Sequence, residues 1–212
     1  MLTVVKVGGG LGRGAGDDAL RALCAALGEL GRRHPLLVVP GGAWFADAVR
    51  EADGRFALPA ATSHRMAVLG MEQFGWLLSE LIPGAERSTQ ARAGAGGTTV
   101  LLPGALALDR LPASWEVTSD SIAAWVAGEA GAGRLVLVKE VDGLFAQWPA
   151  EGEPIARMTA AELGALRPAG VDAYLPTALA NASFETWVIS GRDPERLVQL
   201  VEHGATLGTR IA

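Results

Sequence analysis

The chain has 212 residues, of which 50% are hydrophobic and 19% charged, and its formal net charge is −5. This length and apolar content suffice for a large buried core, which excludes disorder as the dominant state. The acidic balance argues against a nucleic-acid-binding protein that uses a basic face. We therefore expect a folded protein without a nucleic-acid partner.

Cysteine content and hydropathy indicate the cellular compartment in which the protein works. Cys24 is the only cysteine, which excludes an intramolecular disulfide and a multi-cysteine metal site. We expect its thiol to pack as a small apolar group in a helix. The sequence shows no basic leader with a cleavage site and no apolar run of the roughly 18 to 20 residues that a membrane span needs. We expect a cytoplasmic protein with no membrane partner.

The first half of the chain alternates predicted strands with predicted helices. Short apolar runs that end in glycine indicate buried strands, and leucines at helical spacing indicate helices. Asp17 and Asp18 are expected to cap the first helix and Ser63 the third. In chain order, we predict a strand at 2–7, a helix at 19–32, a strand at 36–39 and helices at 44–51 and 63–81.

The second half repeats this alternation. The segment 83–112 is the least clear, apart from a strand at 98–102. Thr159 with Glu162 forms the pattern of a capping box. The other predicted elements are a helix that starts at Ser119-Asp120, a strand at 135–138, a short helix after Thr159, a strand at 186–189, a helix from 193 to 201 and a closing strand at 208–211. Alternating strands and helices predict an α/β fold with a mainly parallel sheet, in one domain with a soft division near residue 115.

The two lysines of the chain occupy similar places. Sixteen of the 18 basic residues are arginine, and only Lys6 and Lys139 are lysine. A coding bias toward arginine is an alternative explanation for the ratio, but not for the positions. Each lysine ends a β-branched run just before a glycine turn, where a compact ammonium supplies a point charge that a guanidinium cannot.

Several familiar site motifs are absent from the sequence. Neither lysine follows a Walker-type loop, and the G-x-G-x-x-G and G-x-S-x-G spacings are missing. The three histidines form no H-x-x-x-H pair, so we expect no protein-held metal site.

Chemistry-bearing residues instead follow successive predicted strands. Because parallel strands end at one edge of a sheet, these residues are expected to meet there. Ammonium groups and backbone N–H groups suit the charge of a transferring phosphoryl group. Taken singly, each feature has a plainer explanation: a tight turn, a solvated lysine or, for Asp120, a helix N-cap. The set consists of Lys6, Gly8-Gly9, Gly41-Gly42, Thr118-Ser119-Asp120 and Lys139 before Val141-Asp142-Gly143.

This ordered set resembles the amino acid kinase superfamily over nearly the whole chain. The resemblance implies an αβα sandwich, with an acceptor bound by about 1–115 and ATP with Mg²⁺ by about 116–212. It further implies a homo-oligomer, for which the helix at 63–81 is the expected interface. The segments that carry it are Val5-Lys6-Val7-Gly8-Gly9, Val39-Pro40-Gly41-Gly42-Ala43, Thr118-Ser119-Asp120 and Val138-Lys139-x-Val141-Asp142-Gly143-Leu144-Phe145.

Roles for individual residues follow from the same resemblance. Lys6 and Lys139 would flank the transferring phosphoryl group, and Asp120 would organise the two lysines. The glycines Gly8, Gly9, Gly41 and Gly42 would donate backbone N–H groups to the phosphates, with Thr118 and Ser119 beside them. Lys139, Val141, Asp142, Gly143 and Phe145 would contact the nucleotide.

Two further segments, 61–67 and 172–176, look most like a small branch of the superfamily. That branch phosphorylates 5-(aminomethyl)-3-furanmethanol phosphate, on the route to methanofuran-type one-carbon carriers. The alternatives are a uridylate or isopentenyl phosphate kinase and a non-catalytic nucleotide or oxyanion binder, such as a molybdenum storage protein.

The acceptor's own phosphate is expected near His64 and Arg65. Both follow the start of the predicted helix at 63–81, where N–H groups favour anions, and a guanidinium suits phosphate. The alternative is a local cap at His64 and a solvated Arg65. An acceptor ammonium would need a carboxylate, for which Asp47, Glu72 and Asp172 are candidates.

Overall fold

The computed structural model describes residues 1–12, 17–94, 96–149 and 151–212 of the chain. In this part of the chain, eight strands form one sheet with the order β3-β4-β2-β1-β5-β7-β8-β6. All neighbouring strands are parallel except β7 and β8. The strands are β1 (Thr3–Val7), β2 (Leu36–Pro40), β3 (Glu86–Ser88), β4 (Thr98–Leu101), β5 (Arg134–Lys139), β6 (Arg157–Met158), β7 (Glu185–Ser190) and β8 (Thr209–Ile211).

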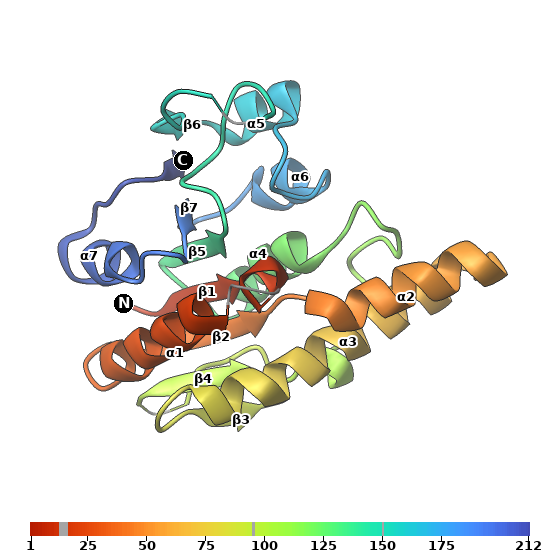
Figure 1. The fold of residues 1–212 in the computed structure, drawn as a ribbon, viewed down its shortest axis with the longest axis horizontal. Helices are drawn as coiled ribbons and strands as arrows, with labels where there is room; N and C mark the ends of the chain where they lie inside the picture. The colour runs from red at the N-terminus through yellow and green to blue at the C-terminus, as the bar shows by residue number, and fades with distance from the viewer. Residues whose placement is uncertain (13–16, 95, 150) are drawn as a thin grey trace.

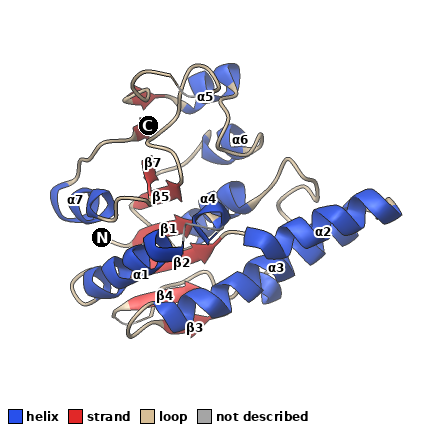
Figure 2. Cartoon of the chain, viewed as in Figure 1, coloured by secondary structure: helices blue, strands red, loops and turns tan. Residues whose placement is uncertain are grey.

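Helices cover both faces of this sheet (Figures 1 and 2). The core on one face is formed with α4, α5 and α6, and the core on the other with α1 and α7. Helix α3 contributes side chains to both cores. The α-helices are α1 (Asp17–Gly31), α2 (Ala43–Phe56), α3 (Ala60–Leu81), α4 (Ser119–Glu129), α5 (Ala160–Leu166), α6 (Leu175–Leu179) and α7 (Glu195–His203), with short 3-10 turns η1 (Gly9–Gly12) and η3 (Pro103–Ala105).

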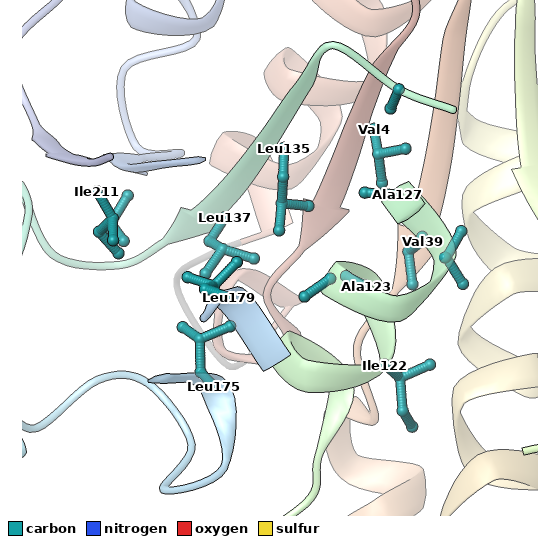
Figure 3. Close-up of a cluster of buried hydrophobic side chains, with 14 of the residues drawn as sticks. Val4, Val39, Ile122, Ala123, Ala127, Leu135, Leu137, Leu175, Leu179 and Ile211 are labelled. Carbon is teal, nitrogen blue, oxygen red and sulfur yellow. The ribbon is translucent and has the colours of Figure 1, made fainter. Parts of the chain in front are cut away.

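Side-chain alternation in the central strands decides which groups face α4. Val5 and Val7 of β1 lie in the core beside α1, whereas Val4 lies in the core beside α4. Because side chains alternate along a strand, Lys6 shares the α4 face with Val4. Figure 3 shows that the α4 face of the sheet meets small alanines of α4, which let the helix approach closely.

The chain changes direction across the sheet between β1 and β5. After β1 it builds β2, β4 and β3 on one side, and β5 and β7 lie on the other. Open α/β sheets bind ligands in the crevice at the carboxyl ends of the strands at such a switch point. Lys6 and Lys139 lie on these two adjacent strands, at their carboxyl ends.

The structure confirms the predicted α/β class and the mainly parallel sheet between helices. The predicted strands all form, and the capping box of Thr159 and Glu162 is present. Cys24 is buried in α1, and burial raises the pKa of its thiol to about 12. No helix in the described ranges combines the length and apolar character that crossing a bilayer requires.

Some boundaries differ from the predictions. Strands β3 and β6 and helix α6 were not predicted, and α2 continues five residues beyond its predicted end, to Phe56. Helix α3 begins at Ala60 after Pro59, so the prediction that Ser63 caps it is wrong. Ser63 instead is buried and donates a hydrogen bond to Asp53 of α2.

Candidate active site

Two lysines and one aspartate form an ionic cluster at the switch point of the sheet. Lys6 Nζ lies 3.0 Å from Asp120 Oδ1, and Lys139 Nζ lies 2.7 and 2.6 Å from the two carboxylate oxygens. The side chains of Lys6 and Asp120 are about 5% exposed or less, and that of Lys139 is 14% exposed. The structure thus brings together the three residues that the sequence singled out, and it leaves one excess positive charge there.

Asp120 reaches the lysines from the first turn of α4. Thr118 is the N-cap of this helix, so the alternative that Asp120 acts as an N-cap is wrong. Because the helix dipole favours a negative charge near its N-terminus, this place also suits the carboxylate. Asp120 Oδ2 further accepts a hydrogen bond of 3.2 Å from the backbone N–H of Asp172.

Burial and mutual attraction set the protonation states of the cluster. Burial alone would raise the pKa of Asp120, but the charges of Lys139 and Lys6 hold it well below the usual range. Burial lowers the pKa of Lys139 to about 8, because the attraction of Asp120 only partly offsets desolvation and the charge of Lys6 adds repulsion. Lys139 therefore stays mostly protonated at pH 7 and loses its proton at lower pH than an ordinary lysine, and Asp120 stays ionised.

Asp172 fixes the start of α4 from a distant part of the sequence. Its Oδ2 accepts hydrogen bonds from Thr118 N (3.0 Å), Thr118 Oγ1 (2.9 Å) and Ser121 N (2.9 Å), and its Oδ1 accepts one from Ser121 Oγ. With its carboxylate occupied in this way, Asp172 is not free to pair an acceptor ammonium. The sequence missed this role because Asp172 lies more than 50 residues from its partners.

The two predicted glycine turns pack against each other at the ends of β1 and β2. A Cβ on Gly41 would lie 2.8 Å from the backbone nitrogen of Gly9, and one on Gly8 would lie 2.7 Å from the carbonyl oxygen of Val138. Glycine is therefore required for this close approach. The N–H groups of Gly8 and Gly41 extend the strand pairing by donating to Val138 O and Val7 O. The N–H groups of Gly8 and Gly41 are thus engaged within the sheet, and donation to phosphate stays a prediction for Gly9 and Gly42.

A cavity opens between α2, α3 and the N-terminus of α4, the helix that carries Asp120. Thr118 and Ser119, the two residues before Asp120, line it. Its lining combines apolar side chains with two cationic or titratable groups and an indole. The lining residues are Gly42, Ala46, Arg50, His64, Ala67, Val68, Met71, Trp115, Val117, Thr118, Ser119 and Ile122.

His64 lines this cavity as expected, and its Nε2 atom is buried without a hydrogen-bond partner among the described residues. Arg65 is exposed and does not line the cavity, because it follows His64 on the outer side of α3. The guanidinium at the cavity belongs to Arg50, which sequence reasoning missed. The sequence did carry a signal for Arg50, because Ala46 and Arg50 lie about one helical turn apart after the glycine turn at 41–42 and so share one side of the helix.

The other carboxylates expected to meet an acceptor ammonium lie outside the cavity. Asp47 accepts a hydrogen bond of 2.8 Å from Arg50, and Glu72 accepts one of 2.6 Å from the backbone N–H of Gly104. Neither residue lines the cavity. The expectation of a direct carboxylate partner for the ammonium is therefore unsupported at all three positions.

Three of the five predicted nucleotide residues line another cavity, at the ends of β5 and β7, whereas Lys139 and Gly143 do not. Val141, Asp142 and Phe145 line it together with two arginines, Arg192 and Arg196. Asp142 Oδ1 lies 2.7 Å from Arg196 Nη1. Gly143 is buried, and a Cβ there would lie 2.8 Å from the side chains of both Pro154 and Thr209, so glycine permits close packing here.

A protein-held magnesium site does not fit the residues of this cluster. No group of three or more histidine, cysteine or acidic side chains in the described ranges could hold a metal ion. Asp120, the carboxylate at the centre of the cluster, is already occupied by two ammonium groups. Any Mg²⁺ would depend on phosphate oxygens of a bound nucleotide for most of its ligands.

Comparison with known proteins agrees with this geometry. The model of the amino acid kinase family matches residues 1–183. The 5-(aminomethyl)furan-3-yl methyl phosphate kinase of Methanocaldococcus jannaschii is 26% identical over 218 residues, which cover 98% of this chain and 96% of that protein. The acetylglutamate kinase of Acidothermus cellulolyticus is 32% identical over 103 residues, only 46% of this chain and 35% of that enzyme. The structure of uridylate kinase from Archaeoglobus fulgidus covers 100% of both chains with a TM-score of 0.78 at 19% identity, which shows a shared fold. Because the family model spans most of its length, the chain belongs to the amino acid kinase family.

Proposed function

We propose that this kinase transfers the γ-phosphoryl group of ATP to a small acceptor that already carries a phosphate, and that the acceptor is 5-(aminomethyl)furan-3-yl methyl phosphate. The observation that carries the proposal is the pair of buried lysines on one aspartate, together with a cavity at the N-terminus of the same helix that has its own arginine and histidine. The full-length similarity to the Methanocaldococcus jannaschii kinase supports this acceptor.

The cluster supplies positive charge to a transfer that needs little covalent chemistry from the protein. Lys6 and Lys139 meet the charge on the oxygens of the transferring phosphoryl group, which is greatest in the transition state. Asp120 holds both ammonium groups and is not a general base, because its carboxylate is fully engaged. No such base is needed, since the attacking phosphate oxygen of the acceptor is already ionised near pH 7.

The cavity is the proposed acceptor site, in the half of the chain formed by about 1–115. Arg50 and His64 would bind the acceptor's phosphate, assisted by N–H groups of Gly42 and the N-terminus of α4. Val68, Met71 and Ile122 would pack against the ring. Trp115, at the division between the two halves, would close one side of the site.

The nucleotide is proposed to bind the half formed by about 116–212. Val141, Asp142 and Phe145 would contact it, with Arg192 and Arg196 near its phosphates and Lys139 between the two sites. When bound with the nucleotide, Mg²⁺ would neutralise charge on the β- and γ-phosphates. We place the enzyme in the cytoplasm, where ATP is available, and propose that it self-associates through α3.

A coupled assay of ADP release tests the proposal. The purified chain is given ATP, Mg²⁺ and one of four acceptors: the aminomethylfuran phosphate, UMP, isopentenyl phosphate or N-acetylglutamate. We expect the highest kcat/KM with the aminomethylfuran phosphate and formation of its diphosphate. A preference for N-acetylglutamate would overturn the proposed class of acceptor. ATP binding without turnover of any acceptor would support a non-catalytic binder instead.

A further inference from the structure

One carboxylate outside the lysine cluster gathers hydrogen bonds from three separate segments. Asp53, near the end of α2, accepts from Trp115 Nε1 at 2.7 Å, from Ser63 Oγ at 2.9 Å and from Leu58 N at 3.1 Å. These donors belong to the loop before α4, to α3 and to the turn after α2. Asp53 therefore ties together the elements that surround the proposed acceptor cavity.

The site is built for an ionised carboxylate. An ionised aspartate only accepts hydrogen bonds, and all three partners are donors without charge. The hydrogen bonds from Trp115 and Ser63 lower the pKa of Asp53, so its charge persists throughout the physiological range. Hydrogen bonds to a charged acceptor are stronger than those between neutral groups, which favours a fixed geometry for the indole.

Fixing Trp115 also fixes other parts of the cavity wall. Trp115 lies in the segment between η3 and α4, which has no strand or α-helix of its own to hold the ring. The guanidinium of Arg50 lies over the indole, 5.0 Å from its centroid, and both side chains line the cavity. His64 Nδ1 lies 3.4 Å from the carbonyl oxygen of Ser114 in the same segment. Three lining residues thus depend on where this segment is held.

We propose that Asp53 is a positioning residue for acceptor binding, acting through Trp115 on the placement of Arg50. This inference rests on the proposed function of the cavity as the acceptor site. Asp53 itself does not line the cavity, so its removal changes acceptor binding only through the indole that it holds. The nucleotide cavity at the ends of β5 and β7 lies beyond its reach and is unaffected.

The test is a double-mutant cycle with Asp53→Asn and Trp115→Phe. Asparagine keeps the shape of the side chain but turns one acceptor into a donor, and phenylalanine keeps a ring but loses Nε1–H. We expect each single variant to raise the KM for the aminomethylfuran phosphate about tenfold, the size of one lost charge-assisted hydrogen bond. The KM for ATP should stay within about twofold of wild type. The double variant should be no worse than either single variant.

Control experiments distinguish a failure of this inference from a failure of the proposed function. Glu51→Gln, on the exposed part of the same helix, should leave both KM values unchanged. Additive effects in the cycle, or an unchanged acceptor KM in either variant, would overturn the role of Asp53. If Asp53→Asn does not fold, Ser63→Ala, which removes one hydrogen bond to Asp53 without changing a residue that lines the cavity, still decides the matter through the split between the two KM values. A wild-type chain that phosphorylates no phosphorylated acceptor would instead contradict the proposed function.

Discussion

Lys6 and Lys139 both form ion pairs with the carboxylate of Asp120. Substitution of either lysine tests its part in phosphoryl transfer. Replacing either lysine by alanine removes charge that is used most in the transition state, so we expect kcat to fall about 100- to 1,000-fold, with the KM for the acceptor changed little. Arginine at either position should restore only part of the activity, because its planar fork cannot reproduce two ammonium groups on one aspartate. Steady-state kinetics, with each substrate varied at a saturating concentration of the other, measure kcat and both KM values for these variants.

The lowered pKa of Lys139 also predicts how nucleotide binding depends on pH. Its pKa is lowered to about 8, so the ammonium loses its proton as pH rises through this value. We expect the affinity for a non-hydrolysable ATP analogue, measured by calorimetry on the acceptor-free protein, to weaken from about pH 8 upward. The phosphate groups of ATP are fully ionised there, so the change belongs to the protein.

The variant Asp120→Asn tests whether the titration of Lys139 causes this pH dependence. Loss of the neighbouring negative charge should lower the pKa of Lys139 further, and the pH at which affinity declines should move below that of wild type. A decline at the same pH in both proteins, or none up to pH 10, would show that Lys139 does not control nucleotide binding.

At the scale of elements, the N-terminus of α4 joins the two halves of the site. Asp172 receives four hydrogen bonds from Thr118 and Ser121, and its backbone donates to Asp120. We expect Asp172→Ala to lower the free energy of unfolding by about 2 to 3 kcal/mol, as for hydrogen bonds to a charged group. The kcat should fall as well, because the first turn of α4 carries Asp120.

A matched loss of capping at another helix separates these two effects. Thr159→Ala removes the capping box of α5, far from the lysines, and should cost about 1 kcal/mol with no change in kcat. Denaturant titration and steady-state kinetics on both variants provide the comparison. Equal effects of the two variants on kcat would contradict a positioning role for Asp172.

The same helix shows what the sequence could and could not predict. Lys6, Asp120 and Lys139 were predictable because each follows a local signal, a strand end or a helix start, and a parallel sheet gathers such ends. Asp53 and Asp172 carried no such signal. The indole that Asp53 binds lies 62 residues away, and the partners of Asp172 lie 51 and 54 residues away, so only the tertiary structure reveals these hydrogen bonds.

Arg65 and Arg50 show a second limit of local reasoning. Both belong to predicted helices, and the choice between them depended on which side of a helix faces the cavity. The start of α3 was predicted three residues late, and the neighbour of His64 was assumed to share its direction. Successive residues of a helix point about 100° apart, so Arg65 lies on the exposed side.

For the whole molecule, the outer surface of α3 bears on self-association. Leu69 and Trp76 are 44% and 48% exposed, and their separation of seven residues places them on one side of the helix. We expect light scattering to show a dimer or larger species at micromolar concentration. The double variant Leu69→Glu with Trp76→Glu should shift the molecule to a monomer without lowering its thermal stability, since both side chains lie outside the core. The matched variant Leu207→Glu changes an exposed leucine outside the helices and should leave the mass unchanged. A monomeric wild-type protein at these concentrations would contradict the proposed interface at α3. The acceptor site would then be formed by the residues of one chain alone.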